Sequence, residues 1–292
     1  MFAATAMETT MKNRKTSNTG WCSKFVLCLA LAAVPAAGAW AQREEQHEGV
    51  AVGKSSRLAS LVPASEVENA AGQQYHQMLQ DAASKRALAQ PDHPQLQRIR
   101  VVAQRLIQQA PQWNKRAANW QWEVNLIGSN QVNAFCMPGG KIAFYSGILD
   151  QLKLSDDEIA MVMGHEMAHA LREHARERMA KGALTNVGAN VLVQVLGLGQ
   201  VGQALTGYGA QLVSLKFSRS DESEADLVGM ELAARAGYDP RAAITLWQKM
   251  GQASRGSPPQ WLSTHPSGVS RITELQKNLP NVMPLYERAK HA

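Results

Sequence analysis

Residues 155–171 read SDDEIAMVMGHEMAHAL, and this stretch decides the fold. Ser155, followed three residues later by Glu158, forms a capping box that predicts a helix over residues 156–180. His165 and His169 stand one turn apart on this helix, about 40° apart around its axis, so both imidazoles can bind one ion. Glu166 projects toward the same side, where its carboxylate can take a proton from water activated by the ion. The pattern is typical of metal-assisted peptide hydrolysis, and the alternative is a solvated helix face.

A third protein ligand is expected, because an enzymatic zinc site usually has three. The residues directly after the motif do not supply it. In the extension HExxHxxGxxH, Arg172 takes the glycine position and Ala175 the position of the third histidine. His174 misses that position by one residue, and we interpret it as a surface histidine. The third ligand is therefore expected from a separate part of the chain.

Residues 218–226, SRSDESEAD, supply a carboxylate on a second helix, predicted over residues 221–236. Glu222 and Asp226 are four residues apart and share a helix face. Glu222 can therefore bind the ion while Asp226 accepts the outer N–H of a ligating histidine. Glu224 points away from this face and is the weaker ligand candidate. Taken alone, the segment would be a charged solvent face; together with the histidine motif it predicts a metal site.

A small sheet is predicted before the histidine helix. Residues 120–126 alternate apolar and polar side chains, and residues 133–137 and 141–145 form two further short strands joined by PGG at 138–140. An extended peptide can pair with an exposed edge strand, and residues 141–145 are our candidate edge; the alternative is an ordinary hairpin. The candidate substrate-binding residues are Gly139, Gly140, Lys141, Ile142 and Ala143.

The remaining elements are predicted to be helical. Amphipathic helices are expected over residues 65–90 and 93–110, another over 239–251, and a last short one after a loop at 252–266, ending near residue 278. Residues 182–215 contain no charged residue and indicate either a lid on the domain or a membrane-associated segment. The chain shows no internal repeat. The sequence therefore predicts one α+β domain, mostly helical with a small antiparallel sheet.

The first 41 residues have the layout of a secretory signal peptide. Four basic residues precede an apolar run over 25–39, and AWA at 39–41 offers a cleavage site after Ala41. A membrane anchor is the alternative, but the run is about 15 residues long and a spanning helix needs roughly 20. We expect residues 42–56 to form a flexible leader and residues 57–292 to form a single zinc metallopeptidase domain.

Composition and charge exclude several classes of protein. Hydrophobic residues make up 45% of the chain, enough for a full core, so wholesale disorder is excluded. Residues 1–41 carry +3 of the formal net charge of +6, and no basic run is longer than two, so no nucleic-acid partner is expected. Removal of residues 1–41 would leave Cys136 as the only cysteine. We expect its thiol to pack inside, with a redox or zinc-binding role as the alternative.

Four motifs in this order resemble the HtpX and CAAX-prenyl-protease group of gluzincin metalloproteases. They are the histidine motif, ESEAD at 222–226, NAFCMPGGKI at 133–142 with Gly147, and STHP at 263–266 with Arg271. The resemblance covers residues 120–280, and within the group the chain is most similar to the periplasmic LoiP- and BepA-like members. It implies a zincin-like metalloprotease domain.

The resemblance also implies roles for individual residues. His165, His169 and Glu222 would hold one Zn²⁺ per chain, Glu166 would be the general base, and Asp226 would orient a ligating histidine. His265 would be either a fourth ligand that keeps the enzyme latent or a catalytic residue that stabilises the oxyanion. Both roles of His265 stay open at this point.

These observations predict a secreted zinc metalloendopeptidase of the periplasm. Its expected substrates are unfolded or misassembled cell-envelope proteins, so that it would serve protein quality control. It could associate peripherally with the membrane or with the outer-membrane assembly machinery, and a membrane-anchored protease results if residues 1–41 or 182–215 stay in the bilayer. The alternative is a chaperone-like client-binding protein with a latent or structural zinc site. The sequence does not determine the oligomeric state or the cleavage preference.

Overall fold

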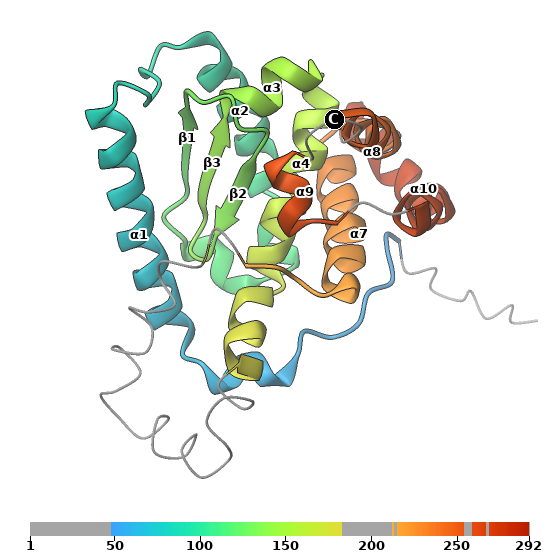
Figure 1. Ribbon diagram of the computed structural model, residues 1–292. Coiled ribbons are helices and arrows are strands. Elements are labelled where there is room, and N and C mark those ends of the chain that lie inside the picture. Colours follow the sequence, from blue (N-terminus) through green and yellow to red (C-terminus); the bar gives the residue numbers. More distant parts are fainter. Residues whose placement is uncertain (1–47, 183–211, 213–214, 254–258, 267–268, 292) are drawn as a thin grey trace, which may run out of the picture. The chain divides into compact units, whose positions relative to one another are not determined.

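The computed structural model describes residues 48–182, 212, 215–253, 259–266 and 269–291 (Figure 1). The chain divides into two compact units, Met1–Glu44 and Glu45–Ala292, and all described residues belong to the second unit. The predicted signal peptide, and most of the uncharged segment 182–215, lie outside the described residues.

The described part is mostly helical around one small sheet, which confirms the predicted fold class. The helices are α1 (Ala64–Ser84), α2 (Pro94–Ile107), α3 (Ser146–Leu152), α4 (Asp156–Leu171), α7 (Arg219–Arg235), α8 (Ala242–Ala253), α9 (Gln260–Thr264) and α10 (Val269–Lys290). Short 3₁₀ turns lie at η1 (Arg57–Leu61), η2 (Ala110–Gln112) and η3 (Lys115–Asn119). The strands are β1 (Glu123–Ile127), β2 (Ala134–Met137) and β3 (Lys141–Tyr145).

The sheet is mixed, and in this detail it differs from the antiparallel sheet expected. Its order is β1-β3-β2: β2 and β3 form an antiparallel hairpin, whereas β1 runs parallel to β3. Gly139 and Gly140 both have positive φ, near 80°, which makes the hairpin turn tight. After this turn, β3 lies between β2 and β1 in the sheet. Alternation along each strand indicates that strands exist, but it does not determine which strands become neighbours.

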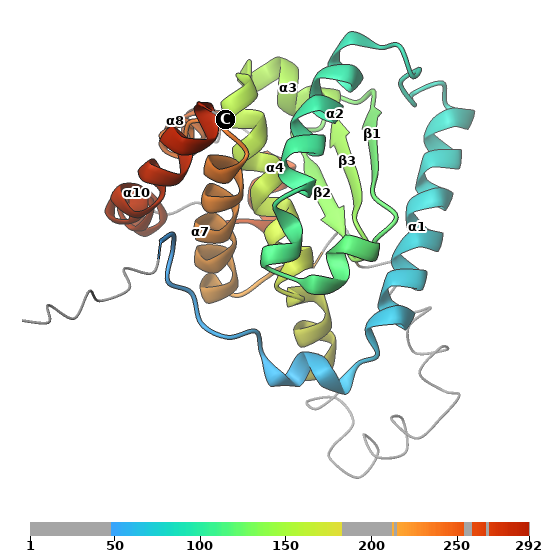
Figure 2. The same ribbon diagram turned by 180° about the vertical axis from the view of Figure 1, so that it is seen from behind.

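Helices cover both faces of the sheet (Figures 1 and 2). On one face, Phe135 and Ala143 pack with Tyr75 of α1. On the other face, Ile142 and Phe144 belong to the main core, which also holds the buried sides of α2, α4, α7, α8 and α10. Neighbouring residues of a strand thus face opposite layers, as the pleat requires. α4 lies against β2 and beside α7.

Two helix boundaries differ from the prediction. α4 ends at Leu171 because Glu173 adopts a positive φ of 61°, and residues 174–182 then form a separate helical stretch. α10 continues to Lys290 through Pro280 and Pro284, although it was expected to end near residue 278. Val282 and Leu285 are buried in the main core, so packing of this helix outweighs the cost of the two prolines.

The segment before η1 packs against α7, at least in its described part. Residues 48–56 form no helix or strand, but Val50 is buried and its N–H donates to Glu231 Oε2 at 2.7 Å. A flexible leader was expected over 42–56. This buried polar contact joins Val50 to α7.

Two glycines allow α4 and α7 to approach closely. A Cβ on Gly164 would lie 2.6 Å from the carbonyl oxygen of Gly229, and one on Gly229 would lie 2.5 Å from the backbone nitrogen of His165. Both contacts are with backbone atoms, which cannot rotate away. The close crossing places the histidines of α4 beside the acidic residues of α7.

Gly229→Ala is therefore expected to destabilise the protein by about 1–3 kcal/mol, the cost typical of overpacking. An exposed glycine in a helix usually gains up to about 1 kcal/mol on replacement by alanine. Gly251 of α8 is the matched control, because no described heavy atom lies within 4 Å of a Cβ built there. Urea unfolding of both variants measures the difference. Equal effects of the two substitutions would contradict the close-crossing argument.

Candidate metal centre

Four side chains from three helical elements lie close together. His165 and His169 come from α4, Glu222 from α7, and His265 follows the last residue of α9. One potential ligand atom from each lies within 4.8 Å of those of the others, and all four residues are buried. The structure thus brings together the three predicted zinc ligands and the residue whose role the sequence leaves open.

The distances among the first three residues suit a tetrahedral metal site. His165 Nε2 lies 3.2 Å from His169 Nε2, and the two atoms lie 3.6 Å and 3.5 Å from the oxygens of Glu222. Ligand atoms about 2.0–2.2 Å from a tetrahedral zinc ion are separated by about 3.3 Å. The donor set of imidazoles and one carboxylate is also one that zinc prefers.

Unpartnered polar atoms provide a second test of whether a metal fits. Among the described residues, neither Oε1 of Glu222 nor Nε2 of His265 has a hydrogen-bond partner, although these atoms are buried; the other Glu222 oxygen, Oε2, pairs with Arg271 Nη1 at 2.8 Å. Buried polar atoms are costly without a partner, and a cation between them would supply one. The residues present therefore fit a metal ion.

Asp226 and Arg271 support the site from the side of α7 and α10. Asp226 Oδ1 lies 3.0 Å from His165 Nδ1, the position predicted for it. The Arg271 guanidinium donates to both oxygens of Asp226, at 2.6 and 2.7 Å, and lies 2.8 Å from Glu222 Oε2. Burial alone would raise the pKa of Asp226, but Arg271 and the contact with His165 lower it below its usual value.

His174 is buried beside the metal centre, so the interpretation of it as a surface histidine was wrong. Its Nδ1 lies 2.9 Å from Nδ1 of His169, and its Nε2 lies 3.3 Å from Glu224. The break of α4 at Glu173 is the physical reason, because it places the residues after it off the α4 path. Phe217, before α7, stacks on the His169 ring with a centroid separation of 4.0 Å.

Glu166 lies beside the ligands and is held by a tryptophan. Trp261 Nε1 donates to Glu166 Oε1 at 2.6 Å, and His265 Nε2 lies 3.7 Å from the same oxygen. Burial raises the pKa of Glu166 well above its usual value, and the nearby Glu222 adds to this, while Trp261 and Arg271 oppose it. Trp261 was not identified as a site residue from the sequence; its position four residues before His265 is the one available sequence signal.

Burial favours the neutral form of His165, His169 and His265 in the metal-free protein. Burial lowers the pKa of His165, and it lowers those of His169 and His265 further. Neutral imidazole is the form that binds a metal. Burial also raises the pKa of Glu222 to about 8, an effect that a bound cation would reverse.

The candidate edge strand is corrected by the sheet order. β3 lies in the centre with partners on both sides, so Lys141, Ile142 and Ala143 cannot pair with a substrate. All three are buried, as are Gly139 and Gly140 in the turn. The sequence identified the hairpin, but within the described residues the hairpin strand with an edge that pairs with no other strand is β2.

β2 presents its outer edge to the metal centre. Tyr145 N–H donates to Asn133 O at 3.1 Å, so alternation directs the backbone groups of Ala134 and Cys136 away from β3. A cavity of about 30 Å³, the size of about one water molecule, is lined by residues 135–138, Glu166, His169 and Phe217. Cys136 lines it with its thiol protonated, because burial raises its pKa well above the usual value.

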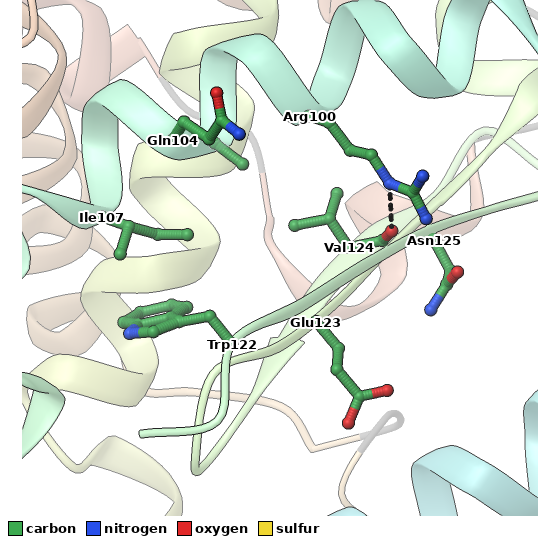
Figure 3. Close-up of a pocket in the computed structure, with 8 residues that line it drawn as sticks. Arg100, Gln104, Ile107, Trp122, Glu123, Val124 and Asn125 are labelled. Atoms are coloured by element: carbon green, nitrogen blue, oxygen red, sulfur yellow. Dashed lines mark hydrogen bonds between the residues drawn. The ribbon is translucent and has the colours of Figure 1, made fainter. Parts of the chain in front are cut away.

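A larger hollow of about 420 Å³ lies elsewhere, between α2 and β1 (Figure 3). Arg100 and Gln104 border it from the helix, and Trp122 and Glu123 from the chain entering the strand. Arg100 Nε donates to the Val124 carbonyl at 3.2 Å. Its lining contains no histidine or cysteine.

Comparison with known proteins agrees with this geometry. Residues 93–279 match the sequence model of Peptidase family M48. The chain belongs to this family. The match confirms the predicted metalloprotease class and its zincin-like fold. It runs from α2 into the first half of α10 and so includes every residue of the metal centre.

Individual M48 relatives match parts of the chain. The mitochondrial metalloendopeptidase OMA1 of Arabidopsis thaliana is 41% identical over 51% of this chain and 30% of its own length. The enzyme of the same name from Schizosaccharomyces pombe is 37% identical over 55% of this chain and 47% of its own length. The beta-barrel assembly-enhancing protease of Escherichia coli is 33% identical over 55% of this chain and 35% of its own length. The chain therefore spans less than half the length of these M48 relatives.

Proposed function

We propose that this M48 chain is a zinc-dependent endopeptidase, in which His165, His169 and Glu222 hold one zinc ion. The observation that carries the proposal is the convergence of two α4 imidazoles and an α7 carboxylate beside Glu166, with Glu222 Oε1 lacking a hydrogen-bond partner among the described residues. A purely structural zinc site does not need a buried carboxyl group beside its ligands. Glu166 therefore favours catalysis over a structural role.

When bound, zinc supplies Lewis-acid chemistry: it lowers the pKa of a water molecule and polarises the scissile carbonyl. Glu166 acts as the general base that takes the proton of the attacking water. Trp261 fixes Glu166 Oε1 at 2.6 Å, which leaves Oε2 to exchange the proton. Once protonated in this way, the same carboxyl can donate the proton to the leaving nitrogen.

The edge of β2 is the substrate-binding strand in this proposal. A peptide pairing with the backbone of Cys136 would lie beside Glu166 and would be held mainly by main-chain hydrogen bonds. The N–H of Ala134, which donates to Asn133 Oδ1 at 3.0 Å, would have to exchange this partner to join the pairing. Such binding tolerates many side chains but requires an extended chain. The cavity is too small for a peptide, so the residues that line it must move apart. Unfolded polypeptides are therefore the proposed substrates.

The cell envelope is the proposed location, with misassembled envelope proteins as substrates in protein quality control. Two observations support it: the signal-peptide layout of residues 1–41, and a relative named as a beta-barrel assembly-enhancing protease. Other relatives are named as mitochondrial enzymes, and these support the chemistry rather than this location. Within the described residues, no helix has the length and hydrophobicity required to span a bilayer. Peripheral association with the membrane or assembly machinery belongs to the same proposal.

Removal of the metal tests this function. We expect the purified protein to digest casein, an unfolded substrate, and to stop when a chelator removes zinc. One equivalent of zinc should restore digestion, while a tightly folded protein should resist cleavage throughout. If the chain instead prevented aggregation of casein without cleaving it, with or without zinc, the chaperone-like alternative would replace the proposal. No observation on the described residues favours that alternative at present.

For His265, we propose the role of a fourth ligand that keeps the enzyme latent. Its Nε2 is buried, has no hydrogen-bond partner among the described residues, and shares the ligand cluster. Its Nδ1 faces Thr264 Oγ1 at 2.9 Å, which directs the other nitrogen to the cluster.

His265→Ala is then expected to raise kcat/KM several-fold and to weaken zinc binding about 10-fold, because the fourth position opens to water. Steady-state kinetics on a quenched peptide, together with a zinc-binding titration, measures both. A fall of kcat by about 10²-fold or more would instead assign His265 to oxyanion stabilisation.

A further inference from the structure

The two ligating histidines are supported in different ways at their outer nitrogens. His165 Nδ1 lies 3.0 Å from a carboxylate, that of Asp226. His169 Nδ1 lies 2.9 Å from another histidine, His174, whose other ring nitrogen lies 3.3 Å from Glu224. All of these groups except Glu224 are buried. The second arrangement was not expected from the sequence.

Geometry assigns the protons along this chain of groups. His169 Nε2 faces Glu222 and His165, so a neutral His169 that binds metal through Nε2 carries its proton on Nδ1. His174 Nδ1 must then accept that proton's hydrogen bond. The proton of His174 consequently sits on Nε2, where Glu224 Oε2 accepts it. If His174 carried its proton on Nδ1 instead, the lone pair of its Nε2 would face Glu224 Oε2.

Glu224 is itself held in place at its other oxygen. Arg172 Nε donates to Glu224 Oε1 at 2.6 Å, and the same guanidinium also bonds the carbonyl of Gly53. The side chain of Arg172 is buried, with 8% of it exposed. From Arg172 through Glu224 and His174 to His169, each hydrogen-bond donor therefore faces an acceptor. The Glu224 carboxylate cannot move away without losing its contact with the Arg172 guanidinium.

We propose that His174, with Glu224 behind it, is a positioning residue that orients His169 and fixes its metal-binding tautomer. The inference rests on the proposed zinc site. Groups that hold the outer nitrogen of a ligating histidine typically change metal affinity by about 10- to 100-fold when removed. Here a neutral histidine transmits the orientation set by a more distant carboxylate.

Three variants separate the parts of this chain. His174→Phe keeps a ring but removes both nitrogens, whereas His174→Asn can keep an acceptor oxygen near the position of Nδ1 and loses the link to Glu224. Glu224→Gln keeps an acceptor for His174 but loses the charge that pairs with Arg172. The matched control is His76→Phe, because His76 is exposed on α1 and pairs with Glu123 on the far side of the sheet from α4.

Competition with a chromophoric chelator would measure zinc affinity, without reference to activity. We expect His174→Phe to bind zinc about 10- to 100-fold more weakly than wild type, with smaller losses in His174→Asn and Glu224→Gln and no change in His76→Phe. In the metal-free wild type, long-range ¹H–¹⁵N spectra should show His169 protonated at Nδ1 and His174 at Nε2. His174→Phe should lose the Nδ1 preference of His169.

The outcomes distinguish this inference from the function on which it rests. Absence of zinc binding by wild type would overturn the proposed function. Zinc binding by wild type and equally by His174→Phe would overturn only the positioning role, as would a metal-free His169 protonated at Nε2. If His174→Phe does not fold, the wild-type histidine tautomers and the zinc affinity of Glu224→Gln still test the positioning role. A Glu224→Gln variant that binds zinc as tightly as wild type would contradict that role.

Discussion

Glu166→Gln is expected to lower kcat by about 10²–10⁴-fold, while zinc content and thermal stability stay near wild type. Gln has the shape of Glu and its amide oxygen can still accept the hydrogen bond of Trp261, so the local packing is retained. The amide nitrogen cannot take a proton from water. The loss would thus fall on the chemical step rather than on substrate or metal binding, and KM should change little.

A surface substitution of the same type serves as the control for this result. Glu287 on α10 is exposed, and Glu287→Gln should leave kcat unchanged. Peptide cleavage measured with both variants at equal zinc occupancy gives the comparison. If Glu166→Gln retained more than a tenth of the wild-type kcat, Glu166 would not be the general base.

The second large effect concerns stability. Arg271 is the cation between two buried carboxylates, those of Asp226 and Glu222, and its guanidinium carbon lies 3.8 Å from the Trp247 ring centroid. Arg271→Leu would leave the Asp226 charge buried without its cation. We expect the metal-free protein to lose about 3–5 kcal/mol of unfolding free energy, the cost typical of breaking a buried pair. Bound zinc should reduce the loss, because its charge replaces part of the missing one.

The effect should also depend on pH with a defined sign. The folded-state pKa of Asp226 is lowered, so its ionised form stabilises the fold above the ordinary aspartate pKa of about 3.9, and this stabilisation is lost as the pH falls through the lower folded value. The difference between wild type and Arg271→Leu should therefore shrink below about pH 4. Arg288→Leu is the control, because Arg288 pairs with Glu48 on the surface and should contribute at most about 1 kcal/mol. Similar losses at both positions in urea unfolding would contradict the argument.

The parts of the site that follow from local helix geometry could be predicted from the sequence. Ser155 and Glu158 form both bonds of the expected capping box, at 3.2 and 2.9 Å. Spacing of four residues within one helix places His165 beside His169 and Glu222 on the same face as Asp226. These relations need no knowledge of the tertiary structure.

The parts that depend on packing between distant elements could not be predicted. His174 becomes buried because one residue, Glu173, takes a positive φ and breaks α4, and nothing in its sequence requires this. The central position of β3 depends on which strands become neighbours. Trp261 reaches Glu166 only because the short helix α9 forms where a loop was expected.

Anomalous diffraction at the zinc edge, on crystals of the zinc-loaded protein, tests the central claim most directly. We predict one anomalous peak per chain, about 2.0–2.2 Å from Nε2 of His165, Nε2 of His169 and a carboxylate oxygen of Glu222. A peak without Glu222 among its ligands, or zinc bound at any other place with this cluster empty, would contradict the account.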